Sequence, residues 1–223
     1  MIRRGEPWGS PASSPPDLEV DGDDADLAAA VAAAPGALVV FRPGLGSDLA
    51  RAVGLRAGSG PTPRATEVSV DAVRLAGDGL AADGLACNAV VLGVPPDRLR
   101  WGSPARSVEV DVDGQPWFAG AATTVVIANG QFLRSADIVP RGHPGDGRLE
   151  VQVYELRRRE RRAMRRRLTT GAHVPHPRIR SRTARVVELR AARPVAFEAD
   201  GVSGAAVATV HAEVVPSAFR LLL

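Results

Sequence analysis

The sequence contains no lysine, so all 28 of its basic residues are arginine, and these are set against 25 acidic residues for a net charge of +3. A balance this small indicates no particular class of partner for the chain as a whole.

The single cysteine, Cys87, excludes an intramolecular disulfide, and a cytoplasmic location is expected. Long apolar runs are also missing, since the most apolar stretch, residues 27–41, is interrupted by Pro35 and Gly36. It falls short of the ~18–20 residues that cross a bilayer, so any membrane contact should be peripheral, at the inner face.

Aromatic residues are scarce too, at 4% of 223 residues, although 45% of the chain is hydrophobic. The core should therefore consist of valine, leucine and alanine, and the 23 glycines and 18 prolines predict many turns. Patterns typical of β-strands occur at residues 68–72, 108–112, 123–128, 149–154, 184–189, 195–199, 207–215 and 218–222. So many short strands favour a β-sandwich, with Asp113–Gly114 as a hairpin turn.

The first part of the chain has a different pattern. Residues 1–17 are rich in proline, serine and glycine and are predicted to be disordered. A helix is expected over residues 27–34, capped by Asp24 or Asp26. A short buried strand should follow at residues 37–41.

A glycine-rich loop, residues 43–48, comes next. Its glycines permit tight turning, and either Ser47 or Asp48 can cap a second helix through residues 49–53. These segments together predict one helix–strand–loop–helix unit.

The arginines are concentrated in one region. Residues 157–182 contain 11 arginines and a single acid, Glu160, which gives this segment a local charge of +10 (11 minus 1). Such a surface suits phosphate or anionic lipid headgroups, with Arg165, Arg166 and Arg167 as the candidate headgroup-binding residues. The alternative is a solvated arginine-rich helix that binds nothing.

The same region contains the one convincing helix of the second half, predicted over residues 157–170 and ended by Gly171. A narrow apolar stripe should dock it on the rest of the fold: Leu156, Ala163, Met164 and Leu168. The three tryptophans, Trp8, Trp101 and Trp117, are not interleaved with the arginines as a nucleic-acid stacking surface would require, so no nucleic-acid partner is expected.

Several motifs follow one another in the second half of the chain: residues 125–132 (VVIANGQF), 138–140 (IVP), 145–151 (GDGRLEV), 171–173 (GAH), 193–195 (RPV), 200–201 (DG) and 215–221 (VPSAFRL). In order and spacing they resemble the C-terminal half of bacterial lipid kinases of the diacylglycerol kinase and sphingosine kinase family. Upstream, residues 44–55 are similar to the family's nucleotide-contacting Gly-Thr-x-Asn-Asp-Phe-Ala-Arg stretch. Residues 88–93 are similar to the strand that opens its second domain.

The resemblance implies an α+β fold with two domains. A truncated α/β nucleotide-binding domain would occupy residues 18–64, and a larger antiparallel β-sandwich would occupy residues 65–223. The last strand would return to the first domain. The implied activity is ATP-dependent phosphoryl transfer, assisted by Mg²⁺, to the hydroxyl of a diacylglycerol or sphingoid-type lipid.

The resemblance also assigns residues to that activity. The nucleotide would be bound by Gly22, Asp23, Gly44, Gly46, Ser47 and Asp48. Mg²⁺ would be bound by the carboxylate of Asp146 and the backbone carbonyls of His143 and Arg148.

Two positions depart from the family. Val202 stands where the family has the glutamate that accepts the hydroxyl proton. Glu198 and Asp200 are the candidate substitutes, because strand alternation would place them on the same face as Val202. In addition, Asp24 puts a negative charge in the phosphate-binding turn, where the family has glycine.

Only about 20 residues precede the phosphate-binding turn at Asp21, too few for the family's first βα unit. The nucleotide-binding domain is thus expected to be a remnant, unless a homo-oligomer or a partner chain completes it. Two functions remain open: a lipid kinase that acts at an anionic membrane surface, or a non-catalytic lipid-kinase-like binding or scaffold protein.

Overall fold

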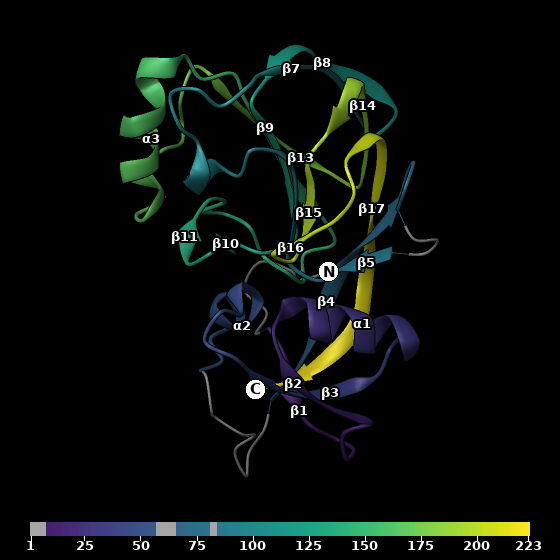
Figure 1. The fold of residues 1–223 in the computed structure, drawn as a ribbon. Helices are drawn as coiled ribbons and strands as arrows, with labels where there is room; N and C mark the ends of the chain where they lie inside the picture. The colour runs from purple at the N-terminus through teal and green to yellow at the C-terminus, as the bar shows by residue number, and fades with distance from the viewer. Residues whose placement is uncertain (1–7, 57–65, 81–83) are drawn as a thin grey trace.

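The computed structural model describes residues 8–56, 66–80 and 84–223. The fold is α+β and dominated by two large sheets, a mixed one of nine strands and an antiparallel one of six (Figure 1). The nine-stranded sheet contains β1 (Ser10–Pro11), β2 (Leu18–Gly22), β3 (Leu38–Pro43), β4 (Thr66–Ala76), β5 (Gly84–Ala86), β7 (Arg106–Val112), β8 (Gln115–Ala122), β14 (Val186–Val195) and β17 (Val207–Leu222). The six-stranded sheet contains β6 (Ala89–Gly93), β9 (Thr124–Ala128), β12 (Leu149–Tyr154), β13 (Ile179–Ala184), β15 (Phe197–Ala199) and β16 (Val202–Ser203).

The two sheets pack face to face into the predicted sandwich. Their shared core contains Val110 and Leu189 from the nine-stranded sheet and Ile127 and Val151 from the six-stranded sheet. This core is built almost entirely from valine, leucine and alanine, as the shortage of aromatic residues predicted. The turn Asp113–Gly114 joins β7 to β8 with φ angles of 52° and 73°, the positive values that a tight two-residue hairpin requires.

A third layer covers the outer face of the six-stranded sheet. It contains helix α3 (Arg161–Leu168), the short hairpin of β10 (Phe132–Leu133) and β11 (Ala136–Asp137), and two 3-10 turns, η1 (Pro96–Arg98) and η2 (Arg158–Glu160). Met164 and Leu168 dock α3 on this face. The helix is shorter than predicted, and Ala163 points to solvent instead of joining the apolar stripe, because the buried positions are spaced by three and four residues.

Two helices and two parallel strands form a smaller unit at one end of the molecule (Figure 1). Helices α1 (Asp24–Ala33) and α2 (Asp48–Val53) pack on β2 and β3. The C-terminal end of β17 lies parallel to β3, with Arg220 opposite Leu38, so the last strand does return to the first domain. No helix in the described residues is both long and apolar enough to cross a membrane.

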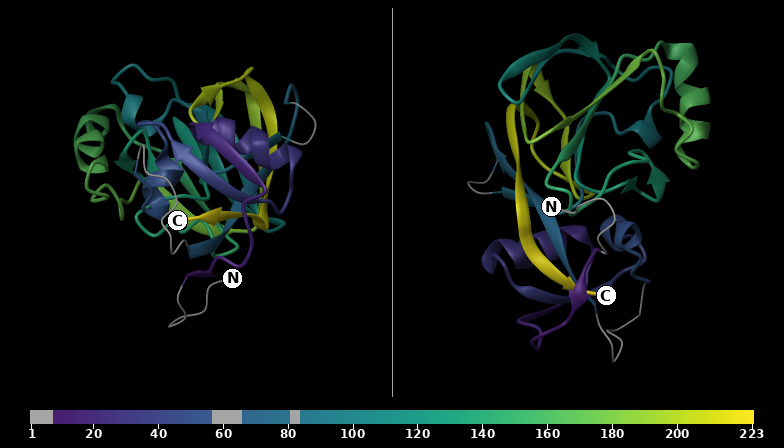
Figure 2. Two further views of the ribbon diagram at one scale, coloured as in Figure 1. Left: turned by 90° about the horizontal axis from the view of Figure 1, so that it is seen from below. Right: turned by 180° about the vertical axis from the view of Figure 1, so that it is seen from behind.

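Strands β4 and β17 belong to both units, and β17 runs from the sandwich into the small unit in Figure 1 and in the right-hand view of Figure 2. Val68 and Val70 of β4 lie in the core of the small unit, whereas Val73 and Leu75 lie in the sandwich core. The change of face coincides with a register shift between Val215 and Phe219 of β17. A boundary at residue 64 or 65 therefore does not separate the two units cleanly.

Three local predictions need correction. Residues 10–11 form strand β1 against β4, so the described part of the N-terminal segment is not disordered; residues 1–7 lie outside the described residues. The N-cap of α1 is Asp23, whose carboxylate accepts hydrogen bonds from the N–H groups of Ala25 and Asp26. Strand β2 was not predicted, because only one of its five residues is buried and no long alternation marks it.

Candidate functional site

The glycine loop leads into α2 as predicted, with Ser47 as the N-cap that accepts a hydrogen bond from the N–H of Ala50 at 3.0 Å. The donors at the start of this helix are already used within the chain. The carboxylate of Asp24 accepts hydrogen bonds from the hydroxyl of Ser47 at 2.5 Å and from the N–H groups of Asp48 and Leu49 at 3.0 and 3.1 Å. A buried carboxylate thus occupies the place where a phosphate would meet the helix.

Burial raises the pKa of Asp24 to about 6, although the hydrogen bonds from Ser47 and Leu49 act to lower it. Its neighbours Gly22 and Asp23 have structural roles. A Cβ atom on Gly22 would lie 2.0 Å from the carboxylate of Asp26, and the carbonyl of Gly22 accepts a hydrogen bond from the N–H of Gly44 at 2.7 Å. The predicted phosphate turn is therefore closely packed against the glycine loop.

Asp48 is buried and connects the small unit to the third layer. Its carboxylate accepts hydrogen bonds from the N–H groups of Arg134 and Ser135, the latter at 2.7 Å. Both residues have positive φ, 48° and 63°, as the turn between β10 and β11 requires. The side chain predicted to bind nucleotide here fixes the position of a hairpin.

Asp200 lies at the turn between β15 and β16, with φ of 47°. Its carboxylate is buried and accepts three hydrogen bonds from consecutive backbone N–H groups: Cys87 at 2.6 Å, and Asn88 and Ala89 at 2.9 Å each. Burial, followed by the negative charge of Asp24, raises its pKa to about 7. Asp24 and the predicted candidate Asp200 thus lie close enough for the charge of one to act on the other.

Glu198 does not share a face with Val202. Because Asp200 and Gly201 form a tight turn, Val202 pairs with Ala199 and Glu198 pairs with Ser203, so the alternation of a single strand does not apply. Glu198 is 6% exposed and forms an ion pair with Arg134, which also contacts Asp97 at 3.1 Å. Val202 is 54% exposed. The structure therefore does not bring the two candidate carboxylates to the position of Val202.

The loop at 143–148 contains the predicted metal ligand Asp146. Its carboxylate accepts a hydrogen bond from the N–H of Arg148 at 3.0 Å, within its own turn. The carbonyl of His143 accepts hydrogen bonds from the N–H groups of Gly145 and Asp146. Among the residues that the structure describes, no three His, Cys, Asp or Glu side chains are placed to hold a metal ion. The predicted Mg²⁺ set thus has one side-chain oxygen donor, Asp146, and its other donors would be the backbone carbonyls of His143 and Arg148.

One buried residue at this junction was missed from the sequence. Asp71 of β4 accepts hydrogen bonds from the N–H groups of Gly147 at 2.6 Å and Ser217 at 2.8 Å, while its own N–H donates to the carbonyl of Pro144 at 2.7 Å. It thus joins the 143–148 loop to the irregular part of β17, where Ser217 has a φ of 50°. In the sequence, nothing about an aspartate within a strand pattern indicates that its side chain is buried.

Two cavities bear on the function. An open cleft of about 510 Å³ lies beside the glycine loop, lined by Gly44, Leu45, Arg51, Leu55 and Ser135 among others. Leu45 is 96% exposed at its rim. A second, very small cavity of about 10 Å³ lies within the sandwich.

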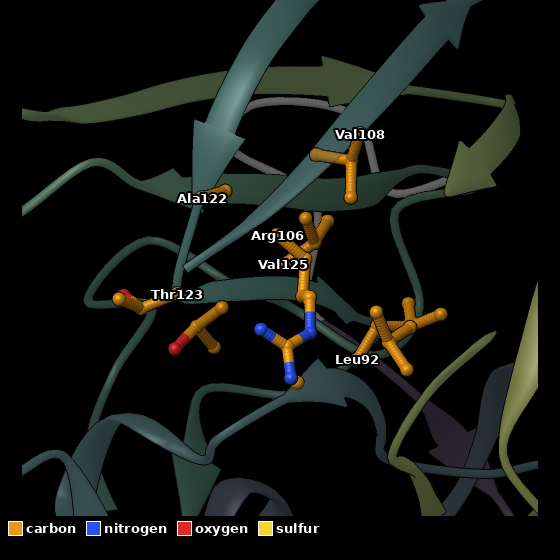
Figure 3. Close-up of a pocket in the computed structure, with 9 residues that line it drawn as sticks. Leu92, Arg106, Val108, Ala122, Thr123 and Val125 are labelled. Carbon is orange, nitrogen blue, oxygen red and sulfur yellow. The ribbon is translucent and has the colours of Figure 1, made fainter. Parts of the chain in front are cut away.

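The side chain of Arg106 extends between Thr123 and Leu92 in that small cavity (Figure 3). Its volume corresponds to about one water molecule. It is therefore too small for a lipid or a nucleotide. The cleft beside the glycine loop is the candidate site because it lies against the segment whose sequence resembles the nucleotide-contacting stretch.

A family model described as the YegS C-terminal NAD kinase beta sandwich-like domain matches residues 99–223, more than half of the chain. The chain belongs to the diacylglycerol kinase-like family of lipid kinases. A search of curated protein sequences finds no significant match.

Solved structures of two kinds of kinase have a similar fold. A diacylglycerol kinase from Bacillus anthracis str. Sterne aligns with a TM-score of 0.71 at 16% identity, over 92% of this chain and 75% of that one. The yeast NADH kinase, solved in complex with NADH, aligns with a TM-score of 0.53 at 12% identity, over 92% of this chain and 61% of that one. Identities this low show the fold alone.

Proposed function

We propose that this chain is a non-catalytic lipid-kinase-like protein, a binding or scaffold module that does not transfer phosphate from ATP. The observation that carries this proposal is the position of Asp24. Its buried carboxylate accepts hydrogen bonds from the hydroxyl of Ser47 and from two N–H groups at the start of α2. A nucleotide phosphate would have to displace this carboxylate while meeting its negative charge at close range.

The residues expected to move a proton support the same proposal. Val202 cannot accept a proton, Asp200 is engaged with three backbone N–H groups, and Glu198 is paired with Arg134. A general base has to reach the hydroxyl that it deprotonates, directly or through one water. Each of these carboxylates instead holds neighbouring parts of the chain together.

The proposal is tested by nucleotide binding and by product formation. Thermal unfolding with and without millimolar Mg²⁺-ATP should give the same midpoint, because a ligand stabilises only the state that binds it. Incubation with radiolabelled ATP and mixed micelles of diacylglycerol should give no labelled lipid. The Asp24→Gly variant should show a nucleotide-dependent shift that the Asp21→Gly variant, altered at an exposed site, does not show. A shift or a labelled product with the unaltered protein would refute the proposal.

The competing function is ATP-dependent phosphoryl transfer to a lipid hydroxyl. It is favoured by the open cleft beside the glycine loop, where Gly44 and Gly46 leave the backbone accessible and Leu45 is fully exposed. A labelled phospholipid that disappears in both Glu198→Gln and Asp146→Ala variants, with folding retained, would establish this function in place of the first. Sphingosine in parallel micelles would identify the substrate class.

A further inference from the structure

Helix α3 lies on the side of the sandwich away from β17 (Figures 1 and 2). Together with η1 and the loop that follows it, the helix carries one basic surface. Eight of the twelve residues from 157 to 168 are arginine. Those exposed to solvent are Arg157, Arg158, Arg159, Arg162, Arg166 and Arg167. Arg98 and Arg100 of the neighbouring loop are exposed as well. We call these residues, together with Trp101, the α3 surface.

The one acid within this helical segment does not neutralise the surface. Glu160 accepts a hydrogen bond from the N–H of Arg157 at 2.7 Å and pairs with Arg178 at 3.5 Å, so its charge is already matched. On the helix, Arg162 and Arg166 are four residues apart and lie on the same side, away from the docked Met164. Two such arginines repel one another by a small amount, and an anionic partner removes that repulsion.

Arg161 differs from its neighbours because it is buried, at 5% exposure. Its guanidinium donates hydrogen bonds to the carbonyls of Arg100, Trp101 and Ser103 at 2.9, 3.0 and 2.8 Å. It therefore fixes the backbone of the 100–103 loop against the N-terminal end of α3. A charged side chain used in this way costs desolvation energy, which three charge-assisted hydrogen bonds offset.

The hydrogen bond from Arg161 also fixes the backbone of Trp101. Its side chain is 64% exposed, although its backbone is held by Arg161. An exposed tryptophan on a fixed loop, flanked by arginines, matches the composition of surfaces that lie at the boundary between lipid headgroups and acyl chains. The indole suits that boundary because it has an apolar ring and one polar N–H, and the arginines suit anionic headgroups.

We propose that the α3 surface binds anionic membranes peripherally, with Trp101 inserted at the headgroup level and Arg162 and Arg166 over the phosphates. The inference does not depend on whether the chain is a kinase, because the surface is separate from the glycine loop and from Asp200. The structure changes which arginines are expected to bind lipid headgroups. Of the predicted Arg165–Arg167, Arg165 is only partly exposed, and Arg162 joins Arg166 on the outward side of the helix. Nucleic acid is the less favoured partner, since one tryptophan provides no platform for successive bases.

Vesicle co-sedimentation without nucleotide tests this proposal. Binding to vesicles of phosphatidylcholine with 30% phosphatidylserine should be strong at low salt, weaken as salt is added and be absent with phosphatidylcholine alone. The Arg162→Gln/Arg166→Gln variant should bind about thirtyfold more weakly, equivalent to about 1 kcal/mol for each arginine. The charge-matched control Arg185→Gln/Arg193→Gln, altered at exposed sites on the opposite sheet, should bind like the unaltered protein.

The tryptophan is tested separately. In a Trp8→Phe/Trp117→Phe background the remaining fluorescence comes from Trp101 and should be quenched by brominated lipid in the anionic vesicles. Arg161→Gln should reduce this quenching while far-UV circular dichroism stays unchanged, as expected of a positioning residue. Equal binding by both double-arginine variants, no quenching, or tighter binding to single-stranded RNA than to vesicles at the same salt would each overturn the proposal.

Discussion

The carboxylate of Asp24 lies 2.5 Å from the hydroxyl of Ser47, across the junction between the first turn of α1 and the N-cap of α2. The contact joins the two segments whose sequences resemble the phosphate-binding turn and the nucleotide-contacting loop of lipid kinases. Where those two segments would cooperate in holding a nucleotide, here they bind each other. The remaining predictions concern the stability of this junction and of the fold around it.

Asp24→Ala should lower the free energy of unfolding by about 2–4 kcal/mol. The variant leaves the N–H groups of Asp48 and Leu49 without their buried acceptor, and each unsatisfied group costs about 1–3 kcal/mol. Urea unfolding followed by circular dichroism measures the change. Asp21→Ala is the control, since its exposed contact with Arg42 at 3.6 Å is screened by solvent and contributes little to stability. Equal effects of the two substitutions would contradict the role of Asp24.

Asp71→Ala should also destabilise the protein, by about 2–4 kcal/mol, because it frees the N–H groups of Gly147 and Ser217 at the place where β4 and β17 change from one core to the other. Asp146→Ala in the adjacent loop should cost less, about 1 kcal/mol, because that carboxylate accepts one hydrogen bond within its own turn. The two urea midpoints, measured side by side, make the comparison. A larger loss for Asp146→Ala would show that its carboxylate has a role beyond the turn.

Glu198→Ala should lower the free energy of unfolding by about 3–5 kcal/mol, because it leaves the partly buried guanidinium of Arg134 without its main partner. The double variant with Arg134→Ala should be less damaging than the sum of the two single changes, as measured by a double-mutant cycle. The pair of Arg190 and Asp111 at 2.8 Å is the matched reference and should show a much smaller coupling, because solvent screens the charge of Arg190. If the effects of Glu198→Ala and Arg134→Ala on the free energy of unfolding simply added, the two side chains would not be coupled and this expectation would be wrong.

His173 should make stability depend on pH between about 6.5 and 4. Burial lowers the pKa of His173 to about 4, so the unfolded chain takes up a proton at higher pH than the folded protein does. The corresponding stability is fully present above pH 6.5 and is lost as the pH falls towards 4. His173 stacks on Tyr154, whose hydroxyl donates to the side-chain carbonyl of Gln152 at 2.6 Å.

Urea unfolding of His173→Gln at pH 7 and pH 4.5 checks this expectation. The variant should be less stable than the unaltered protein at pH 7, and the difference should shrink at pH 4.5. Comparing the two proteins at each pH removes the contribution of Asp24 and Asp200, whose raised pKa values act with the opposite sign. A difference at His173 that grows in acid would contradict the assignment.

Local sequence patterns predicted much of the sandwich. Strand β12 has the predicted bounds 149–154, and the Asp113–Gly114 turn joins two strands as expected. These features depend on short-range chemistry: alternation places side chains on the two faces of a strand, and glycine permits positive φ. The return of the last strand to the first domain came from the family resemblance instead, and the pairing of Arg220 with Leu38 confirms it.

The same patterns failed where partners come from distant parts of the chain. Asp71 interrupts an alternating strand and would be assigned to the solvent face, yet it is buried because β4 passes from one core into the other at that point. Arg161 sits in a run of arginines that all look alike, and only the three carbonyls of the 100–103 loop distinguish it. Strand alternation predicted that Glu198 and Val202 share one face of a strand. The two-residue turn at Asp200 and Gly201 instead puts them on opposite faces of the hairpin.

By itself the sequence determined the β-rich class, the valine and leucine core, the Ser47 cap of the second helix and the family resemblance, because these follow from side-chain types and their spacing along the chain. Only the tertiary structure decided what the carboxylates do. Asp24, Asp48, Asp71 and Asp200 all look like candidate site residues or surface acids in the sequence, and each is engaged with backbone N–H groups of another segment. A buried acid requires such donors, and which donors it finds depends on how distant segments pack together.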